Sequence, residues 1–458
     1  MKYTVLKFGG TSLGNTERIN NVIDIIKEST KTNKIVTVVS AMSALIKTEG
    51  TTSRLIMAKD YALSHGQYIR IIDSILEYHV NIAKQVIEDK NLQDATIEQI
   101  EGILNKLKSF LKAIEVIQEI SYRVEDIIIG TGERLSACMI ANSLTSKGLE
   151  AEYTDLSDIM SSIKSTEVNK DFYEKVKDKL REIIQNCEGV PILTGFIGMM
   201  PGGLLNTIGR GYTDFTAGLS AAALSAEELQ IWKEVDGLYT SDPNKVKNAK
   251  IINRVSAAEA SEITYYGSEV VHPMTMEQVI LAKVPIRIKN TLRPKVPGTV
   301  IDTDDQWIEK TNKPIAVTAK SDILVINITS NRMLHAPGFM YNVFQIMNKH
   351  KLVVDLISTS EVSISMTVDK KNYSSQAVTE LEALGNVVVR ENLSIISLVG
   401  AGMKESVGTS ARFFAALAKK NINIEMISQG ASEINISCII AQSHVLDALQ
   451  EIHDELLI

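Results

Sequence analysis

Short apolar runs alternate with amphipathic segments over most of the first 290 residues, and this alternation limits the fold more than any other feature. The runs 3–8 (YTVLKF) and 34–40 (KIVTVVS) are rich in β-branched residues. Between them, apolar residues recur at helical spacing at Ile19, Val22, Ile23 and Ile26. Together these segments predict a strand, a helix and a second strand, which form one unit of a parallel sheet.

The same alternation returns later in the chain. We expect further strands at 126–130 (DIIIG), 190–195 (VPILTG), 229–235 (LQIWKEV) and 284–290 (VPIRIKN). Residues 53–125 contain almost no glycine or proline and repeat the helical spacing, so they predict a helical insertion, either a lid or simple bulk. The whole pattern predicts an α/β fold in which a mostly parallel sheet is sandwiched by helices.

The length and charge of the chain restrict its function. A chain of 458 residues exceeds what one core usually serves, so we expect two or three domains. A net charge of −7 argues against binding to nucleic acid or to a membrane and favours a small-molecule ligand. We find neither a membrane span nor a signal-peptide pattern, so we expect a cytoplasmic protein. Cys138, Cys187 and Cys438 lie scattered in apolar sequence, which predicts reduced core thiols.

Two similar segments follow a break in the alternation. Residues 290–314 contain three prolines and no periodicity, which predicts a domain boundary. Beyond it an internal repeat begins at Gly338 and again at Gly408, 70 residues later. In each copy a glycine opens an amphipathic helix, and a strand ending in an acid (Asp355 or Glu425) precedes another strand. We expect two small α+β units that pair with each other and sense a ligand.

The stretch VLKFGGTSLG (5–14) joins the first strand to the first helix. It is not a Walker A loop, because Lys7 precedes the glycines. Gly9 and Gly10 nevertheless allow backbone N–H groups to approach an anion, toward which the positive end of the next helix also points. Taken alone, the stretch fits a phosphate-binding loop and an ordinary turn equally well.

A second glycine-rich segment, residues 194–218, contains chemically distinctive side chains. Arg210 lies between two glycines, where a guanidinium can grip a carboxylate through two hydrogen bonds; the alternative is a surface loop. Thr213 and Asp214 lie where an alanine-rich helix begins, so Asp214 is either a helix cap or a functional carboxylate.

The segment GTGERLS (130–136) carries the acidic counterpart. We expect a strand, a glycine turn and a helix here, with Glu133 in the first helical turn, where the helix dipole favours a carboxylate. The functional interpretation is an acid that faces a cationic group of the ligand. An arginine for a carboxylate and a glutamate for an ammonium group would together suit an amino acid.

Two further segments suggest nucleotide binding. The segment IWKEVDGLYTSDP (231–243) ends a strand with acids, a glycine turn and a tyrosine, at the place where parallel sheets commonly hold nucleotides. The segment ISLVGAGMKESVG (396–408) is similar to a dinucleotide fingerprint, but Glu405 stands where the third glycine belongs, so NAD is a remote alternative. The histidines lack zinc-binding spacing, and we expect no metal site.

Taken together, these segments resemble aspartokinase, a family with the amino acid kinase fold. The motifs KFGGTS, VVSAM, GERLS, GRGYTDFTA, VDGLYTSDP and VVHPMT occur along essentially the whole chain and are followed by two ACT-type repeats. The segment MLHAPGFM…VVDLISTSEVSIS is most similar to monofunctional, lysine-sensitive members. The resemblance implies a kinase domain at 1–292, a linker at 293–313, and ACT domains at 314–390 and 391–458, the second of which a strand from 314–320 could complete.

The resemblance also implies a reaction, in which ATP phosphorylates the side-chain carboxylate of L-aspartate to give 4-phospho-L-aspartate. This is the first step of lysine, threonine and methionine biosynthesis, and ATP would bring Mg²⁺. The implied catalytic residues are Lys7 and Asp214. The implied substrate-binding residues are Ser40, Thr52, Glu133, Phe196, Arg210 and Thr213. The implied ATP-binding residues are Gly9, Gly10, Lys233, Glu234, Tyr239 and Asp242.

For the first repeat, the resemblance implies an inhibitory site for L-lysine. Its implied residues are Met333, Gly338, Phe339, Met340, Val354, Asp355, Thr359, Ser360 and Glu361. Asp355 and Glu361 would meet an ammonium group, although both could instead cap strands. Since ACT units typically pair across chains, we expect a homodimer or tetramer whose interface responds to the effector.

The sequence departs from the family pattern in three places. Glu269 and Asn244 stand where relatives often carry cations near the nucleotide, which leaves Lys289 or Lys233 to compensate. The segment after Ser40 is long, so Thr52 is preferred to Thr51 only by its spacing before Leu55. The lost cations leave one alternative open, a catalytically inactive amino-acid sensor on the same fold.

Overall fold

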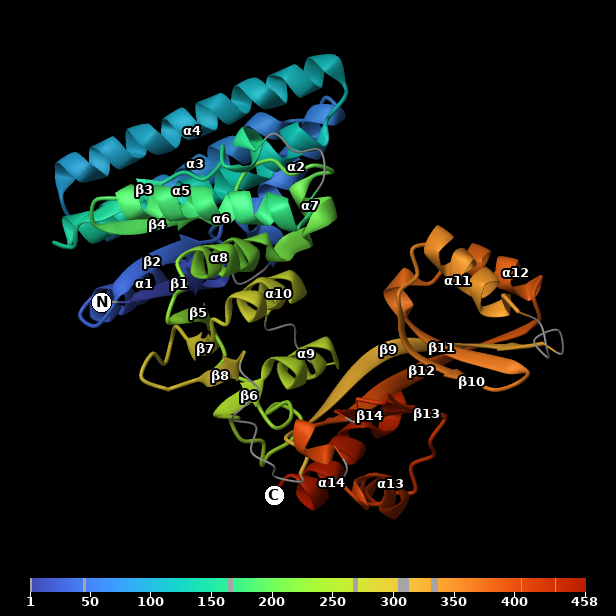
Figure 1. Cartoon of the computed structure of the whole chain (residues 1–458). Coiled ribbons are helices and arrows are strands. Elements are labelled where there is room, and N and C mark those ends of the chain that lie inside the picture. Colours follow the sequence, from blue (N-terminus) through green and yellow to red (C-terminus); the bar gives the residue numbers. More distant parts are fainter. Residues whose placement is uncertain are drawn as a thin grey trace. The chain divides into compact units, whose positions relative to one another are not determined.

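The structure is a computed structural model that describes residues 2–43, 47–163, 168–266, 271–303, 313–330, 337–404, 406–432 and 434–458. The chain forms two compact units (Figure 1). The N-terminal unit comprises Met1–Leu238 and Val270–Asp304, and the C-terminal unit comprises Tyr239–Glu269 and Asp305–Ile458. Residues 239–269 lie inside the first domain expected from the sequence, yet they pack with the C-terminal unit.

The N-terminal unit contains the mostly parallel sheet that the alternating pattern predicts. Its strands run in the spatial order β3-β4-β2-β1-β5-β7-β8, and all neighbours are parallel except β8, which is antiparallel to β7. β1 and β2 are almost entirely buried, as a sheet covered on both faces requires. The strands are β1 (Tyr3–Phe8), β2 (Lys34–Val39), β3 (Ala151–Thr154), β4 (Val190–Thr194), β5 (Glu228–Lys233), β7 (Ile286–Asn290) and β8 (Thr299–Asp302).

Helices cover both faces of this sheet. Helices α1 and α5 pack on one face and α8 on the other, where α6 and α10 lie against α8. The expected insertion is helical, and its long helix α4 runs along the outside of the unit (Figure 1). The helices are α1 (Thr16–Ser29), α2 (Thr51–Leu63), α3 (Tyr68–Val86), α4 (Lys90–Ile117), α5 (Tyr122–Ser146), α6 (Lys170–Asn186), α7 (Leu204–Thr207), α8 (Tyr212–Ala223) and α10 (Pro273–Ala282).

The strand expected at residues 126–130 is wrong, because this segment lies inside helix α5. Glu133 therefore lies in the middle of a helix and not in its first turn. A Cβ atom on Gly130 would lie 2.3 Å from the Phe196 ring, so glycine is needed here for close packing rather than for a turn. The tertiary contact outweighs the weak helix propensity of glycine.

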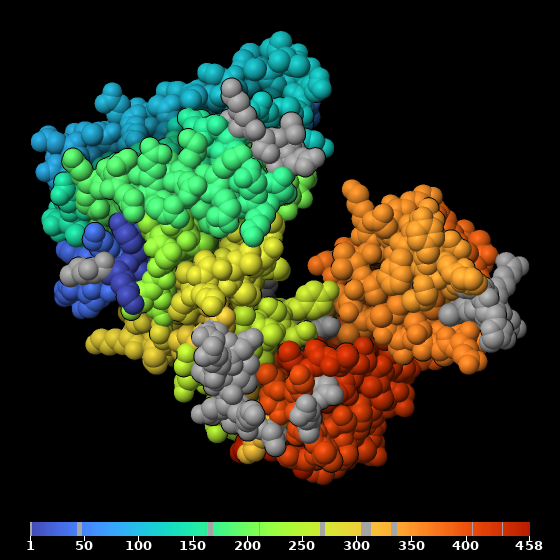
Figure 2. Space-filling model, viewed as in Figure 1, coloured from blue at the N-terminus to red at the C-terminus, as the bar shows by residue number. Residues whose placement is uncertain are grey.

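The C-terminal unit contains the two repeats, which appear as adjoining orange and red lobes in Figure 2. Their strands form one antiparallel sheet in the order β10-β11-β9-β12-β14-β13, in which the long strands β9 and β12 join the repeats. The strands are β9 (Ala316–Thr329), β10 (Val354–Thr359), β11 (Ser363–Asp369), β12 (Asn386–Val399), β13 (Met426–Gln429) and β14 (Asn435–Ala441). The helices are α11 (Phe339–Lys349), α12 (Ser375–Glu382), α13 (Thr409–Lys419) and α14 (Val445–Leu456).

The repeat is visible in equivalent helix starts. Gly338 and Gly408 precede α11 and α13 with φ of 89° and 91°, a left-handed conformation that glycine adopts without strain. The expectation that each first strand ends in an acid is wrong, because Asp355 lies near the start of β10 and Glu425 directly precedes β13. The strands are displaced toward the C-terminus because the buried apolar positions that anchor them, including Leu356 and Met426, follow the acids.

Residues from 239–269 are tied to the repeats by specific contacts. Helix α9 (Ala257–Tyr266) follows β6 (Arg254–Ser256), and Glu259 on α9 accepts a hydrogen bond of 2.6 Å from the backbone of Ala401. Val246 joins the apolar core beneath α13 and α14. Among the described residues, no helix has the length and apolar character needed to cross a membrane.

Candidate active site

The glycine-rich part of the stretch 5–14 (VLKFGGTSLG) forms a tight loop at the end of β1. Residues 9–14, here called the phosphate loop, lead through the 3₁₀ turn Gly10–Leu13 to helix α1, whose N-terminus Asn15 caps with its side chain. A Cβ atom on Gly10 would lie 2.4 Å from the carbonyl oxygen of Ala41, so this position admits only glycine. The loop is thus packed directly against the segment that follows β2.

Lys7 and Asp214 form a buried ion pair beside this loop. The Nζ atom of Lys7 lies 2.7 Å from Oδ1 of Asp214, and their side chains are 8% and 10% exposed. Lys7 is on β1, whereas Asp214 lies in the first turn of α8, where the helix dipole also favours a carboxylate. Burial alone would raise the pKa of Asp214, but Lys7 and Lys233 hold it below its ordinary value. Asp214 is therefore ionised and neutralises Lys7.

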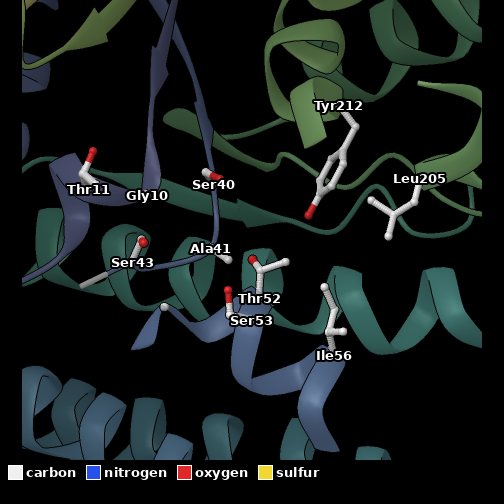
Figure 3. A pocket seen from close by; sticks show the side chains of 11 residues that line it. Gly10, Thr11, Ser40, Ala41, Ser43, Thr52, Ser53, Ile56, Leu205 and Tyr212 are labelled. Carbon is white, nitrogen blue, oxygen red and sulfur yellow. The ribbon is translucent and has the colours of Figure 1, made fainter. Parts of the chain in front are cut away.

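A cavity of about 250 Å³ opens next to the loop, with a volume suited to a small polar ligand. Figure 3 shows the Tyr212 hydroxyl pointing into this space, opposite Thr52 and Ser53 on α2. The cavity is lined by Gly10, Thr11, Ser40, Ala41, Ser43, Gly50, Thr52, Ser53, Ile56, Leu205 and Tyr212. It thus joins the phosphate loop to helix α2 and the start of α8.

Glu133 lies behind the cavity wall and contacts it through Tyr212. The Tyr212 hydroxyl donates a hydrogen bond of 2.6 Å to Oε1 of Glu133, while Oε2 has no hydrogen-bond partner among the described residues. Burial raises the pKa of Glu133 to about 7, despite the opposing effect of the Tyr212 hydrogen bond. A buried carboxylate with one unpartnered oxygen is suited to receive a ligand's cationic group.

The structure brings most of the expected substrate residues close to this cavity. Ser40 and Thr52 line it, and the Thr213 hydroxyl lies 3.4 Å from that of Ser40. Phe196 is buried with its ring against Gly130. Arg210 lies in the 3₁₀ turn Gly209–Gly211, directly before α8, but its side chain is outside the described part of the chain.

The expected nucleotide residues are divided between the two units. Lys233 and Glu234 lie at the end of β5, and Glu234 forms an ion pair of 3.1 Å with Arg18. Tyr239 and Asp242 belong to the C-terminal unit, where Asp242 accepts a hydrogen bond from the Asn244 backbone.

The structure also describes the surroundings of Asn244, which departs from the family pattern, and of Lys289, which was expected to compensate. Lys289 lies 4.9 Å from the centre of the Trp232 ring, and burial lowers the pKa of Lys289. The Asn244 side chain donates a hydrogen bond to Asp242. Glu269 is outside the described residues.

The sequence reasoning did not single out Tyr212. An aromatic residue at the start of an apolar helix is usually read as core, and Tyr212 is indeed almost fully buried. The available signal was its place in GRGYTDFTA, two residues after Arg210 and two before Asp214. Its hydroxyl is the polar group that connects Glu133 with the cavity.

Comparisons with known proteins agree with this geometry. The amino acid kinase family matches residues 2–290, and the ACT domain matches residues 326–383 and 396–456. An aspartokinase of Schizosaccharomyces pombe is 44% identical to the chain over 99% of this chain and 93% of its own. An aspartokinase of Saccharomyces cerevisiae is 43% identical over the same shares. The chain belongs to the aspartokinase family.

Solved aspartokinase structures extend the agreement to three dimensions. Aspartokinase III of E. coli, in complex with aspartate and ADP, has a TM-score of 0.77 and 27% identity to the chain, with 100% of both chains covered. The same enzyme in complex with lysine and aspartate has a TM-score of 0.79 and 27% identity, again over the full chains. The chain is therefore an aspartate kinase, and the ACT match over 396–456 assigns the segment 396–408 to a repeat instead of an NAD site.

The residues expected from the sequence to form an effector site belong to the first repeat. The side chain of Asp355 is buried and accepts hydrogen bonds of 2.7 Å each from Lys320 and from the Tyr265 hydroxyl. Glu361 is exposed in the turn between β10 and β11, next to Ser360. Gly338, Phe339 and Met340 form the start of α11, Val354 and Thr359 are the end residues of β10, and Met333 is outside the described residues.

Proposed function

We propose that the chain transfers the γ-phosphoryl group of ATP to the side-chain carboxylate of L-aspartate, which gives 4-phospho-L-aspartate. The reaction would be the first step of lysine, threonine and methionine biosynthesis. The main support is the buried pair of Lys7 and Asp214, which lies where the phosphate loop meets a small polar cavity.

The chemistry requires positioning and charge neutralisation more than proton transfer. A side-chain carboxylate with an ordinary pKa of about 3.9 is already ionised at neutral pH, so its oxygen attacks the γ-phosphorus without a base, and ADP leaves. Lys7 would stabilise the charge on the transferring group, assisted by backbone N–H groups of Gly9 and Gly10. Asp214 holds Lys7 in place.

The substrate would be held at both ends of its backbone. We assign the α-carboxylate of aspartate to Arg210 and the α-ammonium group to Glu133, next to Tyr212. Ser40, Thr52, Phe196 and Thr213 would complete the pocket.

The nucleotide would lie along Lys233, Glu234, Tyr239 and Asp242, and Mg²⁺ would arrive with ATP. Among the described residues, no three His, Cys, Asp or Glu side chains are grouped to hold a metal ion. We propose that the nucleotide phosphates are the main ligands of this Mg²⁺. Mg²⁺ bound in this way neutralises phosphate charge.

Regulation would come from the C-terminal unit. We propose that L-lysine binds the first repeat near Asp355 and Glu361 and inhibits the kinase, and that the repeats mediate a homodimer or tetramer. The E. coli enzyme crystallised with lysine and aspartate supports this assignment by its similarity to the full chain.

A steady-state assay tests the proposal. ADP formation should require ATP, Mg²⁺ and L-aspartate together, should not occur with L-glutamate, and should decrease when L-lysine is added. Turnover with glutamate but not aspartate would assign another acceptor. Turnover that does not respond to lysine would remove only the regulatory part.

Arg210→Ala tests the substrate assignment. Loss of the guanidinium group that binds the α-carboxylate should reduce kcat/KM for aspartate by about 10²–10³-fold, with little change in KM for ATP. Arg70→Ala, which changes an exposed arginine on α3, is the matched control and should behave like the wild type. Unaltered aspartate kinetics in Arg210→Ala would remove Arg210 from the site.

A further inference from the structure

Four carbonyl groups of the phosphate loop, those of Gly9, Gly10, Thr11 and Gly14, accept hydrogen bonds from donors within the N-terminal unit. The Gly9 carbonyl accepts a hydrogen bond from the Ser12 backbone (3.1 Å), and the Gly10 carbonyl from the Ser43 backbone (3.0 Å). The Thr11 carbonyl accepts from the Arg18 guanidinium at 2.6 Å. A loop that binds phosphate through N–H groups must keep its carbonyl dipoles turned away from the anion, and a carbonyl that already accepts a hydrogen bond is fixed in its orientation.

The bond to the fourth of these carbonyls, that of Gly14, comes from the helical insertion. The Tyr78 hydroxyl on α3 donates a hydrogen bond of 2.8 Å to the carbonyl oxygen of Gly14, at the end of the loop. Farther along the same helix, Gln85 accepts a hydrogen bond of 2.9 Å from Thr16, the first residue of α1. The insertion thus contacts both the loop and the helix whose N-terminus faces it.

We infer that Tyr78 is a positioning residue for the phosphate loop, and that the insertion supports the kinase site instead of being mere bulk. The inference rests on the proposed role of the loop in binding ATP. Support of this kind acts first on the phosphate contacts of the loop. Tyr78 does not line the aspartate cavity, which the loop reaches only through Gly10 and Thr11, so we expect a smaller effect on aspartate binding.

Tyr78→Phe removes the hydroxyl and keeps the ring. We expect ADP binding to weaken and kcat to fall, each by about 3–10-fold, with a smaller change in KM for aspartate than in ADP affinity. Tyr68→Phe is the matched control, because its hydroxyl binds Glu115 within the same insertion. Equal ADP affinity in both variants and the wild type would overturn the inference. A wild type without kinase activity but with weaker ADP binding in Tyr78→Phe would instead contradict only the proposed function.

A second, independent observation concerns Asp355 in the first repeat. Its carboxylate, expected to meet the ammonium group of an effector, already binds an ammonium group of the chain itself. The Nζ atom of Lys320 lies 2.7 Å from Oδ2 of Asp355 and 3.1 Å from Oδ1 of Asp369. The Asp355 side chain is 2% exposed, so a second cation has little room beside Lys320.

The same carboxylate connects the repeat to helix α9. The Tyr265 hydroxyl of α9 donates to Oδ1 of Asp355 at 2.7 Å, and Lys320 lies 5.2 Å from the centre of the Tyr265 ring. The other end of α9 is bound to the second repeat through Glu259. Helix α9 belongs to the 239–269 segment, which also contains two of the proposed nucleotide residues.

The geometry points to Lys320 as an internal competitor of the effector. An amino acid must displace the Lys320 ammonium group from Asp355 to bind there, and its arrival changes the surroundings of Tyr265. This inference rests on the proposed effector site. The hydrogen bond from Tyr265 connects the proposed effector site with the 239–269 segment inside the C-terminal unit, so that an effector bound there changes the surroundings of this segment.

Lys320→Met removes the competitor. We expect the concentration of L-lysine that half-inhibits the full-length enzyme to fall about tenfold, with the same shift in calorimetric affinity. L-Threonine, another end product of the proposed biosynthetic route, is tested in parallel as a second amino acid with an α-ammonium group. Lys320→Arg, which retains the charge, and Lys370→Met, which removes an exposed lysine paired with Glu391, should match the wild type.

Three outcomes would contradict, in turn, the competition by Lys320, the connection to α9 and the proposed effector site. Unchanged affinity for both amino acids in a folded Lys320→Met enzyme would overturn the competition. Tyr265→Phe should bind the effector but respond less in activity, and full inhibition in that variant would remove the connection to α9. If neither the wild type nor Lys320→Met binds either amino acid, the proposed effector site itself is wrong.

Discussion

Lys7→Met is expected to lower kcat by at least about 10²–10³-fold, because it removes the only full charge that the proposed site directs at the transferring phosphoryl group from β1. It should also destabilise the protein by about 3–5 kcal/mol, since Asp214 would remain buried without its cation. Steady-state kinetics and urea unfolding measure the two effects.

A double variant separates these effects. Lys7→Met combined with Asp214→Asn removes both charges, so much of the lost stability should return while kcat stays low. Recovery of activity together with stability would show that Lys7 acts only as the partner of Asp214. Normal kcat in the single variant would remove Lys7 from the proposed mechanism.

The sequence was sufficient to predict the layered fold, and several residues that it proposed for the site lie close together in the structure. Strands 3–8 and 34–40 and the intervening helix followed from apolar periodicity, and the paired repeats followed from the spacing of Gly338 and Gly408. Lys7 and Asp214 each stood at a strand or helix boundary, which is why both could be selected before their ion pair was visible.

Other features depend on contacts between residues distant in sequence. The glycines of 130–136 were read as a turn because nothing local reveals that Phe196 packs against the helix at Gly130. The membership of residues 239–269 in the C-terminal unit depends on contacts such as those of Glu259, which leave no local pattern. Lys320 carries no motif, and only the folded sheet brings it to Asp355.

Glu133→Gln is expected to stabilise the ligand-free protein at pH 8 and to impair aspartate binding. In the folded state the pKa of Glu133 is raised by burial to about 7 from its ordinary 4.5, so the folded chain holds a proton that the unfolded chain releases. Stability is therefore lost as pH rises from about 4.5 to 7. The cost above pH 7 reaches about 3 kcal/mol at 1.36 kcal/mol per pH unit. The Glu133→Gln variant should therefore recover up to that amount of unfolding free energy at pH 8 and little at pH 4.

The same titration predicts how substrate binding depends on pH. If the ammonium group of aspartate requires ionised Glu133, KM for aspartate should rise toward tenfold per pH unit below about pH 7 in the wild type. In Glu133→Gln this dependence should vanish, while kcat/KM for aspartate falls by about 10²–10³-fold from loss of a buried charge pair.

Tyr212→Phe, which removes the hydroxyl that opposes the pKa rise of Glu133, should move the transition in KM to higher pH. A variant that gains stability at pH 8 yet keeps the wild-type KM would place the ammonium group elsewhere. Glu133 would then be a buried acid tolerated for another reason.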